Sequence, residues 1–350
     1  MKFEDIKLEP LLDTLQLEKI DDELYFNSSV YKNRISNSRL GLLNPKQGGS
    51  PDKFFSGFKA AFNPSFALGS AVHEQVLQPE LFKLAGDTGK PTAKLGMMAD
   101  VLYDIYCQRE VLDEDIVEAS NKVDYYKDKM TPDRIMEVKN KCSTYWAVKS
   151  KQELDLSETR EVRYLDKNML DKANACIQSI QSNKEIMDLL HPEGLLEKPI
   201  SECEQAILLD IKATFKDGKE IILPLKAKLD NFTIDTESNI IKVNDLKTHG
   251  QMLTTFNDMK VKFHYNREIA LYMYLLGLVA DKFYNLPNPK KQANYLVVST
   301  VPNFRSMVVP ILINEIRRGF YEFQRLLKYS AYLMCYKGYS FDEQSNKYQL

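Results

Sequence analysis

Three apolar runs between about residues 201 and 248 constrain the fold of this 350-residue chain more than any other part of its sequence. The first run extends from Glu204 to Phe215 and is followed by Asp217-Gly218, a strong short-range hairpin signal. A second run covers about Glu220–Ile234, and a third covers Ile240–Thr248 after a polar turn. Apolar residues in short alternating runs bounded by turn residues are typical of β-strands. The sequence therefore predicts three consecutive antiparallel strands.

Helical patterns and two more strands surround this segment. Apolar residues spaced by one helical turn predict a helix from about Phe66 to Gln78 and another from about His264 to Phe283. Strands are expected at Asn294–Thr300 and Met307–Ile313, before a long helix from Glu315 to about Tyr336. Residues 93–190 are mostly helical in pattern and carry no chemical motif. The order predicts an α+β fold with three regions: an N-terminal segment (1–90), a helical insertion (91–200) and a core (201–350).

Composition limits the classes of function. Hydrophobic residues (44%) and charged residues (27%) are balanced as in globular proteins. The net charge of -2 means that binding to nucleic acid would depend on local clusters of lysine and arginine. The five cysteines form no CxxC pair, so we expect free thiols in a reducing compartment, without a zinc knuckle or a cysteine-held iron–sulfur cluster. The N-terminus lacks the apolar segment of a signal peptide, and no apolar run is long enough to span a bilayer. We therefore expect a cytoplasmic protein.

The second and third strands bring acidic residues together. If a four-residue loop joins Asp235 to Ile240, Asp230 lies opposite Asp245, and Lys228 lies opposite Lys247, on the same face of the sheet. Two opposed carboxylates at about 4 Å repel by roughly 4 kcal/mol at an effective dielectric constant of about 20. A divalent cation would remove this repulsion, and hard oxygen ligands suit Mg²⁺. The pattern thus predicts a metal site, with solvent-facing ion pairs as the alternative.

Several segments resemble one nuclease superfamily. Leu225–Asp230 followed by Val243–Thr248 is similar to the core of PD-(D/E)xK nucleases, in which a basic residue precedes an Asp and an Asp-x-Lys-Thr segment follows a turn. The similarity is greatest to the RecB-like and RecE-like (exonuclease VIII) branch. Leu68–His73, followed by Leu77–Glu80, resembles the helix that carries the metal-contacting histidine of that branch, and Ile35–Leu40 also looks RecE-like. The resemblance spans about residues 30–85 and 200–280.

The resemblance implies a fold and a set of site residues. The fold would be a restriction-endonuclease-like core, a central mixed sheet flanked by helices, here with a helical insertion. Asp230 and Asp245 would be metal ligands for Mg²⁺ or Mn²⁺, Lys247 the catalytic lysine, and His73 the residue that completes the metal site. Gly69, one turn before His73, would allow another part of the backbone to approach the helix closely.

Other candidates depend on finer features. The Gln-x-x-x-Tyr signature of the RecB-like branch falls on Glu268 and Tyr272, so the first position departs from the pattern. Arg267 beside them is a candidate phosphate ligand, with an ordinary surface arginine as the alternative. Glu204 is a candidate acidic residue of the first strand, although a two-residue Asp217-Gly218 loop would pair Gln205 with Asp230 and a bulge would be needed to bring Glu204 in. The local positive charge for DNA would come from Lys226, Lys228, Lys242, Lys260, Lys262 and Arg267.

The resemblance favours a double-strand DNA exonuclease that resects ends in recombination. It suggests a single-strand annealing protein as partner, a homo-oligomer, and a phage origin with action in the host cytoplasm. Two alternatives remain open from the sequence. One is a related endonuclease, RecB-like or of the CRISPR-adaptation type. The other is a catalytically inactive DNA-binding or interaction protein on the same fold.

Overall fold

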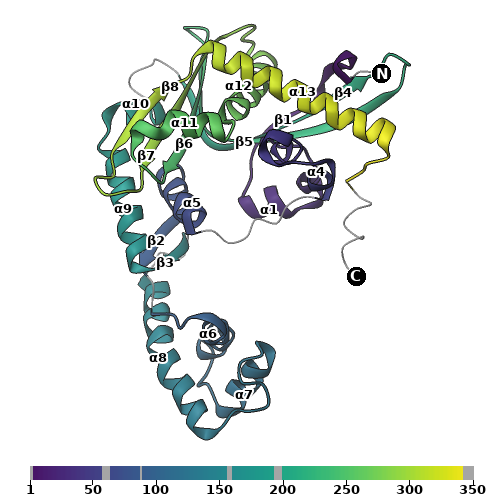
Figure 1. Cartoon of the computed structure of the whole chain (residues 1–350). Coiled ribbons are helices and arrows are strands. Elements are labelled where there is room, and N and C mark those ends of the chain that lie inside the picture. Colours follow the sequence, from purple (N-terminus) through teal and green to yellow (C-terminus); the bar gives the residue numbers. More distant parts are fainter. Residues whose placement is uncertain (1–2, 57–63, 87–88, 156–159, 193–198, 342–350) are drawn as a thin grey trace. The chain divides into compact units, whose positions relative to one another are not determined.

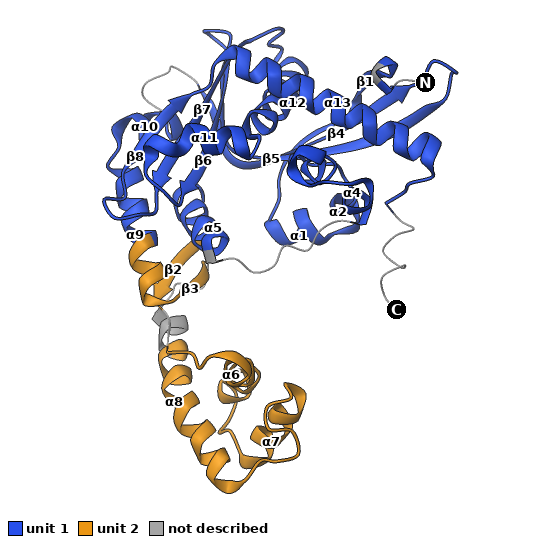
Figure 2. Cartoon of the chain, viewed as in Figure 1, with its two compact units in different colours: residues 1–78, 173–350 blue, residues 79–172 orange. Residues whose placement is uncertain are grey.

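The computed structural model describes residues 3–56, 64–86, 89–155, 160–192 and 199–341 (Figure 1). The chain forms two compact units, residues 1–78 with 173–350 and residues 79–172 (Figure 2). The first unit contains a six-stranded mixed sheet flanked by helices. The predicted α+β class with a central mixed sheet is therefore confirmed.

The sheet of the first unit has the order β1-β4-β5-β6-β7-β8. The strands are β1 (Lys7–Lys19), β4 (Ile200–Thr214), β5 (Glu220–Asp235), β6 (Ile240–His249), β7 (Lys290–Ser299) and β8 (Ser306–Pro310). Neighbours are antiparallel except β6 and β7, which run parallel. Parallel strands need a long crossover, and here helices α11 (Phe256–Lys262) and α12 (Tyr265–Tyr284) form it. The sequence predicted every strand of this sheet except β1.

Helix α12 forms the centre of the hydrophobic core of this unit. It packs on strands β1 and β4–β7 and on α13 (Ile313–Lys337). Its apolar residues from Ile269 to Ala280 are largely buried, which explains the longest apolar run of the sequence as a core helix. No helix among the described residues is both long and apolar enough to cross a membrane.

The other helices of the first unit are α1 (Asp22–Asn27), α2 (Ser29–Lys32), α3 (Asn37–Gly41), α4 (Pro51–Ser56), α5 (Pro64–Leu77) and α10 (Lys184–Leu190), with three short 3₁₀ turns (Phe3–Asp5, Pro45–Gln47 and Leu253–Thr255). Helix α9 (Lys167–Gln181) contains the boundary between the units.

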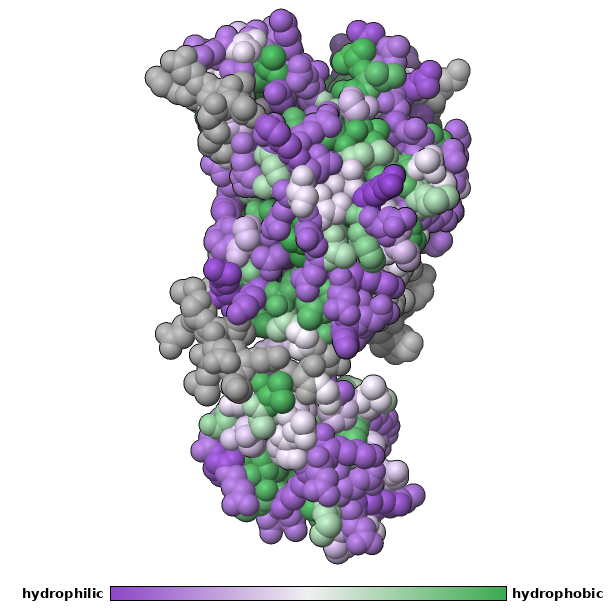
Figure 3. All heavy atoms as spheres, turned by 90° about the vertical axis from the view of Figure 1, so that its left-hand side faces the viewer, coloured by the Kyte–Doolittle hydropathy of each residue, from purple (hydrophilic) through white to green (hydrophobic). Residues whose placement is uncertain are grey.

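The second unit has its own small core. Helices α6 (Ala93–Tyr106), α7 (Asp113–Lys122) and α8 (Pro132–Asp155) pack around buried residues such as Trp146, whose Nε1 donates to Ala99 O at 2.9 Å. A two-stranded parallel sheet, β2 (Phe82–Gly86) and β3 (Glu161–Leu165), belongs to the same unit. The unit, residues 79–172, begins and ends earlier in the chain than the helical insertion expected at 91–200. In the view of Figure 3, hydrophilic residues cover most of the visible surface of each unit, and hydrophobic residues lie in small groups between them.

The register between β5 and β6 is the predicted one. Phe232 pairs with Val243 and Ile234 with Ile241. The Asp235 side chain accepts backbone hydrogen bonds from Glu237 and Ser238, which closes the four-residue loop. The loop length that the register depended on is therefore confirmed.

The hairpin between β4 and β5 differs from the expectation. Phe215 N donates to Lys219 O at 2.9 Å, so the loop contains three residues rather than two. Gly218 adopts the left-handed conformation (φ 84°) that such a loop requires at its last position. The extra residue shifts the register by one, so that Glu204, and not Gln205, lies opposite Asp230. The expected pairing was wrong because the loop has one residue more than the two-residue turn that Asp-Gly commonly forms.

Candidate active site

Three side chains from separate elements converge in a cavity of about 560 Å³. His73 lies on α5, Glu204 on β4 and Asp230 on β5, and one nitrogen or carboxylate oxygen of each lies within 4.8 Å of the others. All three side chains are partly buried. Among the described residues, this is the group of acidic and histidine side chains whose spacing suits a metal ion.

Asp230 occupies the point where β5 and β6 separate. The ladder between the strands ends at Asn231 and Asn244, one residue before the two aspartates. Beyond this point, the backbone N of Leu246 on β6 donates a hydrogen bond to the side-chain oxygen Asp230 Oδ2 at 2.8 Å, and the backbone ladder between the two strands does not continue. The opening makes room for His73, whose Nδ1 lies 3.6 Å from Asp230 Oδ2.

The approach of helix α5 to the sheet brings His73 to this position. A Cβ atom built on Gly69 would lie 3.1 Å from Thr248 Oγ1, closer than most real Cβ contacts. Glycine at this position therefore allows α5 to approach β6, as its place one turn before His73 suggested.

Glu204 reaches the site through an irregular backbone. Its φ is 56°, a left-handed conformation that a side-chain-bearing residue seldom adopts. The regular pairs on either side of it, Cys203–Asn231 and Gln205–Leu229, continue the ladder. Backbone strain of this kind is often found at functional sites. Glu204 Oε2 lies 2.9 Å from Lys228 Nζ, which also lies 2.6 Å from Asp22 Oδ1.

Asp245 and Lys247 lie next to this group. Asp245 is 1% exposed and does not line the cavity. Its Oδ2 lies 2.8 Å from Lys247 Nζ, but neither carboxylate oxygen has a regular hydrogen bond to a described residue. Lys247 Nζ also lies 3.1 Å from Glu268 Oε2, and Tyr272 donates to the other oxygen of Glu268 at 3.2 Å. Glu268, which departs from the expected glutamine, thus holds the lysine in place.

The surroundings perturb the ionisation of these groups. Burial, followed by the charge of Lys247, lowers the pKa of His73 to about 4, so its ring is neutral at pH 7. Burial raises the pKa of Asp230 to about 7, and the nearby carboxylate of Glu204 also raises it. Burial likewise raises the pKa of Asp245 well above its usual range. Burial opposes the charge of Lys247, but the carboxylates of Asp245, Glu268 and Asp230 raise its pKa well above the usual value.

The donor set fits a divalent cation. A neutral imidazole and two carboxylates within 4.8 Å of one another are suitable metal ligands. The buried carboxylate of Asp245 already has the ammonium group of Lys247 at 2.8 Å as its counter-charge, so it does not by itself require a metal ion. When ionised, the cluster has five carboxylates against two ammonium groups, an excess of three negative charges: Asp22, Glu204, Asp230, Asp245 and Glu268 against Lys228 and Lys247.

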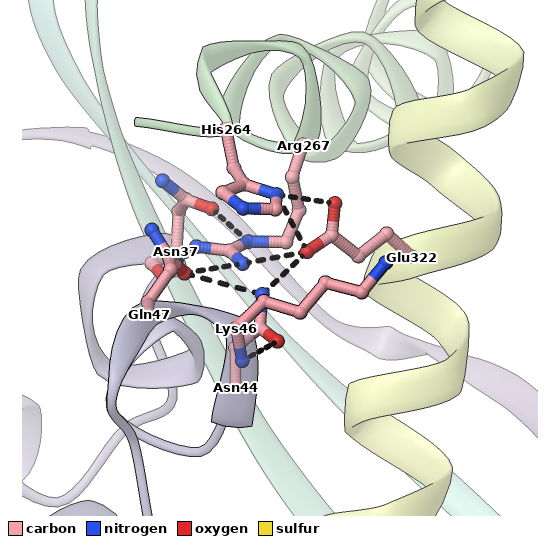
Figure 4. Close-up of polar contacts among 7 residues, drawn as sticks. All are labelled: Asn37, Asn44, Lys46, Gln47, His264, Arg267 and Glu322. Carbon is pink, nitrogen blue, oxygen red and sulfur yellow. Dashed lines mark hydrogen bonds and ion pairs between the residues drawn. The ribbon is translucent and has the colours of Figure 1, made fainter. Parts of the chain in front are cut away.

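Two predicted DNA ligands have other roles in the structure. Arg267 is 2% exposed, and it donates to Asn37, Gln47 and Glu322 (Figure 4). It therefore holds α12, α3 and α13 together, and the prediction that it contacts phosphate is wrong. Lys226 is 5% exposed and donates to Tyr25 O at 2.6 Å.

The other predicted positive charges are also largely engaged. Lys228 lines the cavity, but its ammonium group is paired with two carboxylates. Lys260 is buried against Glu315 at 2.7 Å. Tyr272 lines the cavity and is mostly buried, so it acts through Glu268 rather than as an open contact surface. Lys242 and Lys262 are not among the residues that line the cavity.

Sequence reasoning missed the contribution of α1. Asp22, Tyr25 and Phe26 of this helix line the cavity together with the catalytic candidates. The six-residue helix carries no motif, and only the tertiary structure brings it near β5. No signal in the sequence could have identified these residues as part of the site.

Comparisons with known proteins give a likeness to solved structures but no match in sequence. No family model and no curated protein matches the sequence. Among solved structures, the chain is similar to the "Putative exonuclease" from Eubacterium rectale, with a TM-score of 0.42 and 10% sequence identity over 90% of this chain and 87% of that one. At this level of similarity, the likeness establishes neither a family nor an activity.

Proposed function

We propose that this protein is a metal-dependent deoxyribonuclease of the PD-(D/E)xK type. The observation that carries the proposal is the convergence of His73, Glu204 and Asp230 in one cavity, with the Asp245–Lys247 ion pair next to them. Carboxylates that hold a cation next to an ammonium group are suited to phosphodiester hydrolysis, because negative charge develops on the phosphate in the transition state. The sequence resemblance of the same residues to this superfamily supports the proposal.

Each residue has a distinct role in the proposed reaction. His73, Glu204 and Asp230 would hold Mg²⁺ or Mn²⁺, and the buried carboxylate of Asp245 is a further candidate ligand. The cation would supply Lewis-acid stabilisation of the phosphate and a more acidic water molecule. Lys247 keeps its proton, since three carboxylates raise its pKa, and it can stabilise negative charge on the phosphate. Glu268 and Asp245 hold the lysine from two sides.

The finer assignment rests on the resemblance to the RecE-like branch. We propose a double-strand DNA exonuclease that acts on DNA ends in recombination, in the cytoplasm of a host cell. A single-strand annealing protein as partner and a homo-oligomeric assembly belong to the same proposal.

The test compares linear and closed circular duplex DNA, each with Mg²⁺, Mn²⁺ or chelator. Digestion of the linear form alone, dependent on metal, is the result expected of an exonuclease. Cutting of closed circles would indicate an endonuclease, and absence of cleavage with every metal would overturn the proposal. Asp245→Asn should abolish cleavage, whereas Asp13→Asn, at an exposed position of β1, is the matched control and should cleave like the wild type.

A further inference from the structure

Two exposed phenylalanines line the same cavity as the proposed metal ligands. Phe26 of α1 is 58% exposed, and Phe66 of α5 is 64% exposed. Because both contribute to the cavity lining and are open to solvent, they lie at its solvent-facing rim. Both rings open onto the cavity that holds the proposed metal ligands, and exposed apolar side chains at the opening of a ligand groove can belong to the binding site.

The ring of Phe26 is held by neighbouring groups. Tyr25 packs edge-on against it with ring centroids 5.0 Å apart. The ammonium group of Lys226 lies 5.6 Å from the Phe26 ring centroid and 4.1 Å from that of Tyr25. Lys226, which was expected to bind phosphate, instead supports this aromatic pair.

The charges of the cavity do not favour a polyanion by themselves. Its lining includes five carboxylates and three lysines: Asp22, Glu74, Glu204, Asp230 and Glu268, and Lys226, Lys228 and Lys247. The ammonium groups of all three lysines form hydrogen bonds or ion pairs with other residues of the chain. Besides the proposed metal, a nucleic-acid strand therefore needs a source of affinity that does not depend on free cations.

We propose that Phe26 and Phe66 form a stacking platform for unpaired nucleobases at the end of a DNA strand. The inference deepens the proposed nuclease function and rests on it. Every base has a flat π face, so stacking on aromatic side chains is independent of sequence. A base can stack on these rings only when it is unpaired, so the strand enters the cavity as a single strand. The substrate is then a frayed or single-stranded DNA end, whose terminal phosphodiester reaches the carboxylates below the rim.

A thermodynamic cycle tests the platform. Binding of a single-stranded oligonucleotide is measured with normal terminal nucleotides and with abasic ones, in the Asp245→Asn background to prevent cleavage. Removal of the terminal bases should weaken binding by about 5- to 150-fold when both phenylalanines are present. In the variant that also carries Phe26→Ala and Phe66→Ala, the same removal should have almost no effect, because the cycle isolates the interaction between ring and base. Both side chains are more than half exposed, so these variants should fold.

Two control variants sharpen the test. Phe26→Tyr with Phe66→Tyr keeps both aromatic rings and should preserve the response to the abasic end. Phe283→Ala removes an exposed phenylalanine (46%) of α12 that does not line the cavity, and it should bind like its parent. In the otherwise wild-type enzyme, the double alanine variant should raise KM more than it lowers kcat.

The outcomes separate this inference from the proposed function. In one outcome, the wild type cleaves DNA, and removal of the terminal bases weakens binding equally in the protein with both phenylalanines and in the double alanine variant. This result overturns the platform and leaves the nuclease function intact. Absence of any oligonucleotide binding also overturns the platform. Absence of cleavage together with a ring-dependent abasic effect overturns the nuclease function and supports the stacking surface.

Discussion

Replacing Asp230 by asparagine should make the metal-free protein more stable at pH 8. The amide is nearly isosteric, and its oxygen can still accept the hydrogen bond from Leu246 N. Burial raises the pKa of Asp230 from 3.8 to about 7 in the folded chain, a difference of about 4 kcal/mol at about 1.4 kcal/mol per pH unit. Burial is the largest cause of this shift, the charge of Lys247 opposes it, and repulsion from the nearby Glu204 carboxylate adds to it. The asparagine side chain is uncharged, so the variant lacks the destabilisation caused by the buried charge of Asp230.

The pH dependence follows from the direction of the shift. Because the folded protein binds this proton more tightly than the unfolded chain, the wild type should lose stability as pH rises from about 4 to about 7. The variant lacks this loss, so the two proteins should have similar stability near pH 4 and differ most at pH 8. Thermal denaturation in chelator would then show the variant melting roughly 5–10 °C higher at pH 8, at about 2 °C or more per kcal/mol.

Metal should reduce this difference. A cation at about 100 times its dissociation constant stabilises the wild type by about 2.7 kcal/mol, whereas the variant has lost a ligand. The reasoning is refuted if the wild type in chelator is as stable as Asp230→Asn at pH 8, or if both proteins gain equally from Mg²⁺ or Mn²⁺. Asp13→Asn, on the exposed part of β1, should show neither effect.

Two further variants probe the ion pairs around the site. Lys247→Met leaves the carboxylates of Asp245 and Glu268 without their cation, so it should lose cleavage and about 3–5 kcal/mol of stability in urea denaturation; unchanged stability would show that these ion pairs contribute little. Arg267→Met should cost a similar amount because Glu322 loses its buried partner. The salt dependence of DNA binding should stay the same in this variant, whereas a slope reduced by about 1 would place Arg267 on a phosphate after all.

The interpretation of Arg267 from the sequence failed for a physical reason. Its position beside Glu268, on the helix after the catalytic strands, indicated a phosphate contact. The groups that satisfy its guanidinium come from α3 and α13, and Glu322 lies 55 residues away in the chain. Local pattern carries no information on such distant partners. The same limit applies to Lys226, whose partner Tyr25 precedes it by 201 residues.

The sequence alone determined the strands β4–β6 and the register of β5 with β6, and it placed Asp230, Asp245 and Lys247 on these two neighbouring strands. These features follow from local rules, because side chains alternate along a strand and the loop after Asp235 has a definite length. The tertiary structure decided the rest. One extra loop residue at Gly218 placed Glu204 opposite Asp230, and the packing of α1 and α5 brought Phe26, Phe66 and His73 around the same cavity. Contacts between distant segments depend on how whole elements pack, and no short stretch of sequence records that packing.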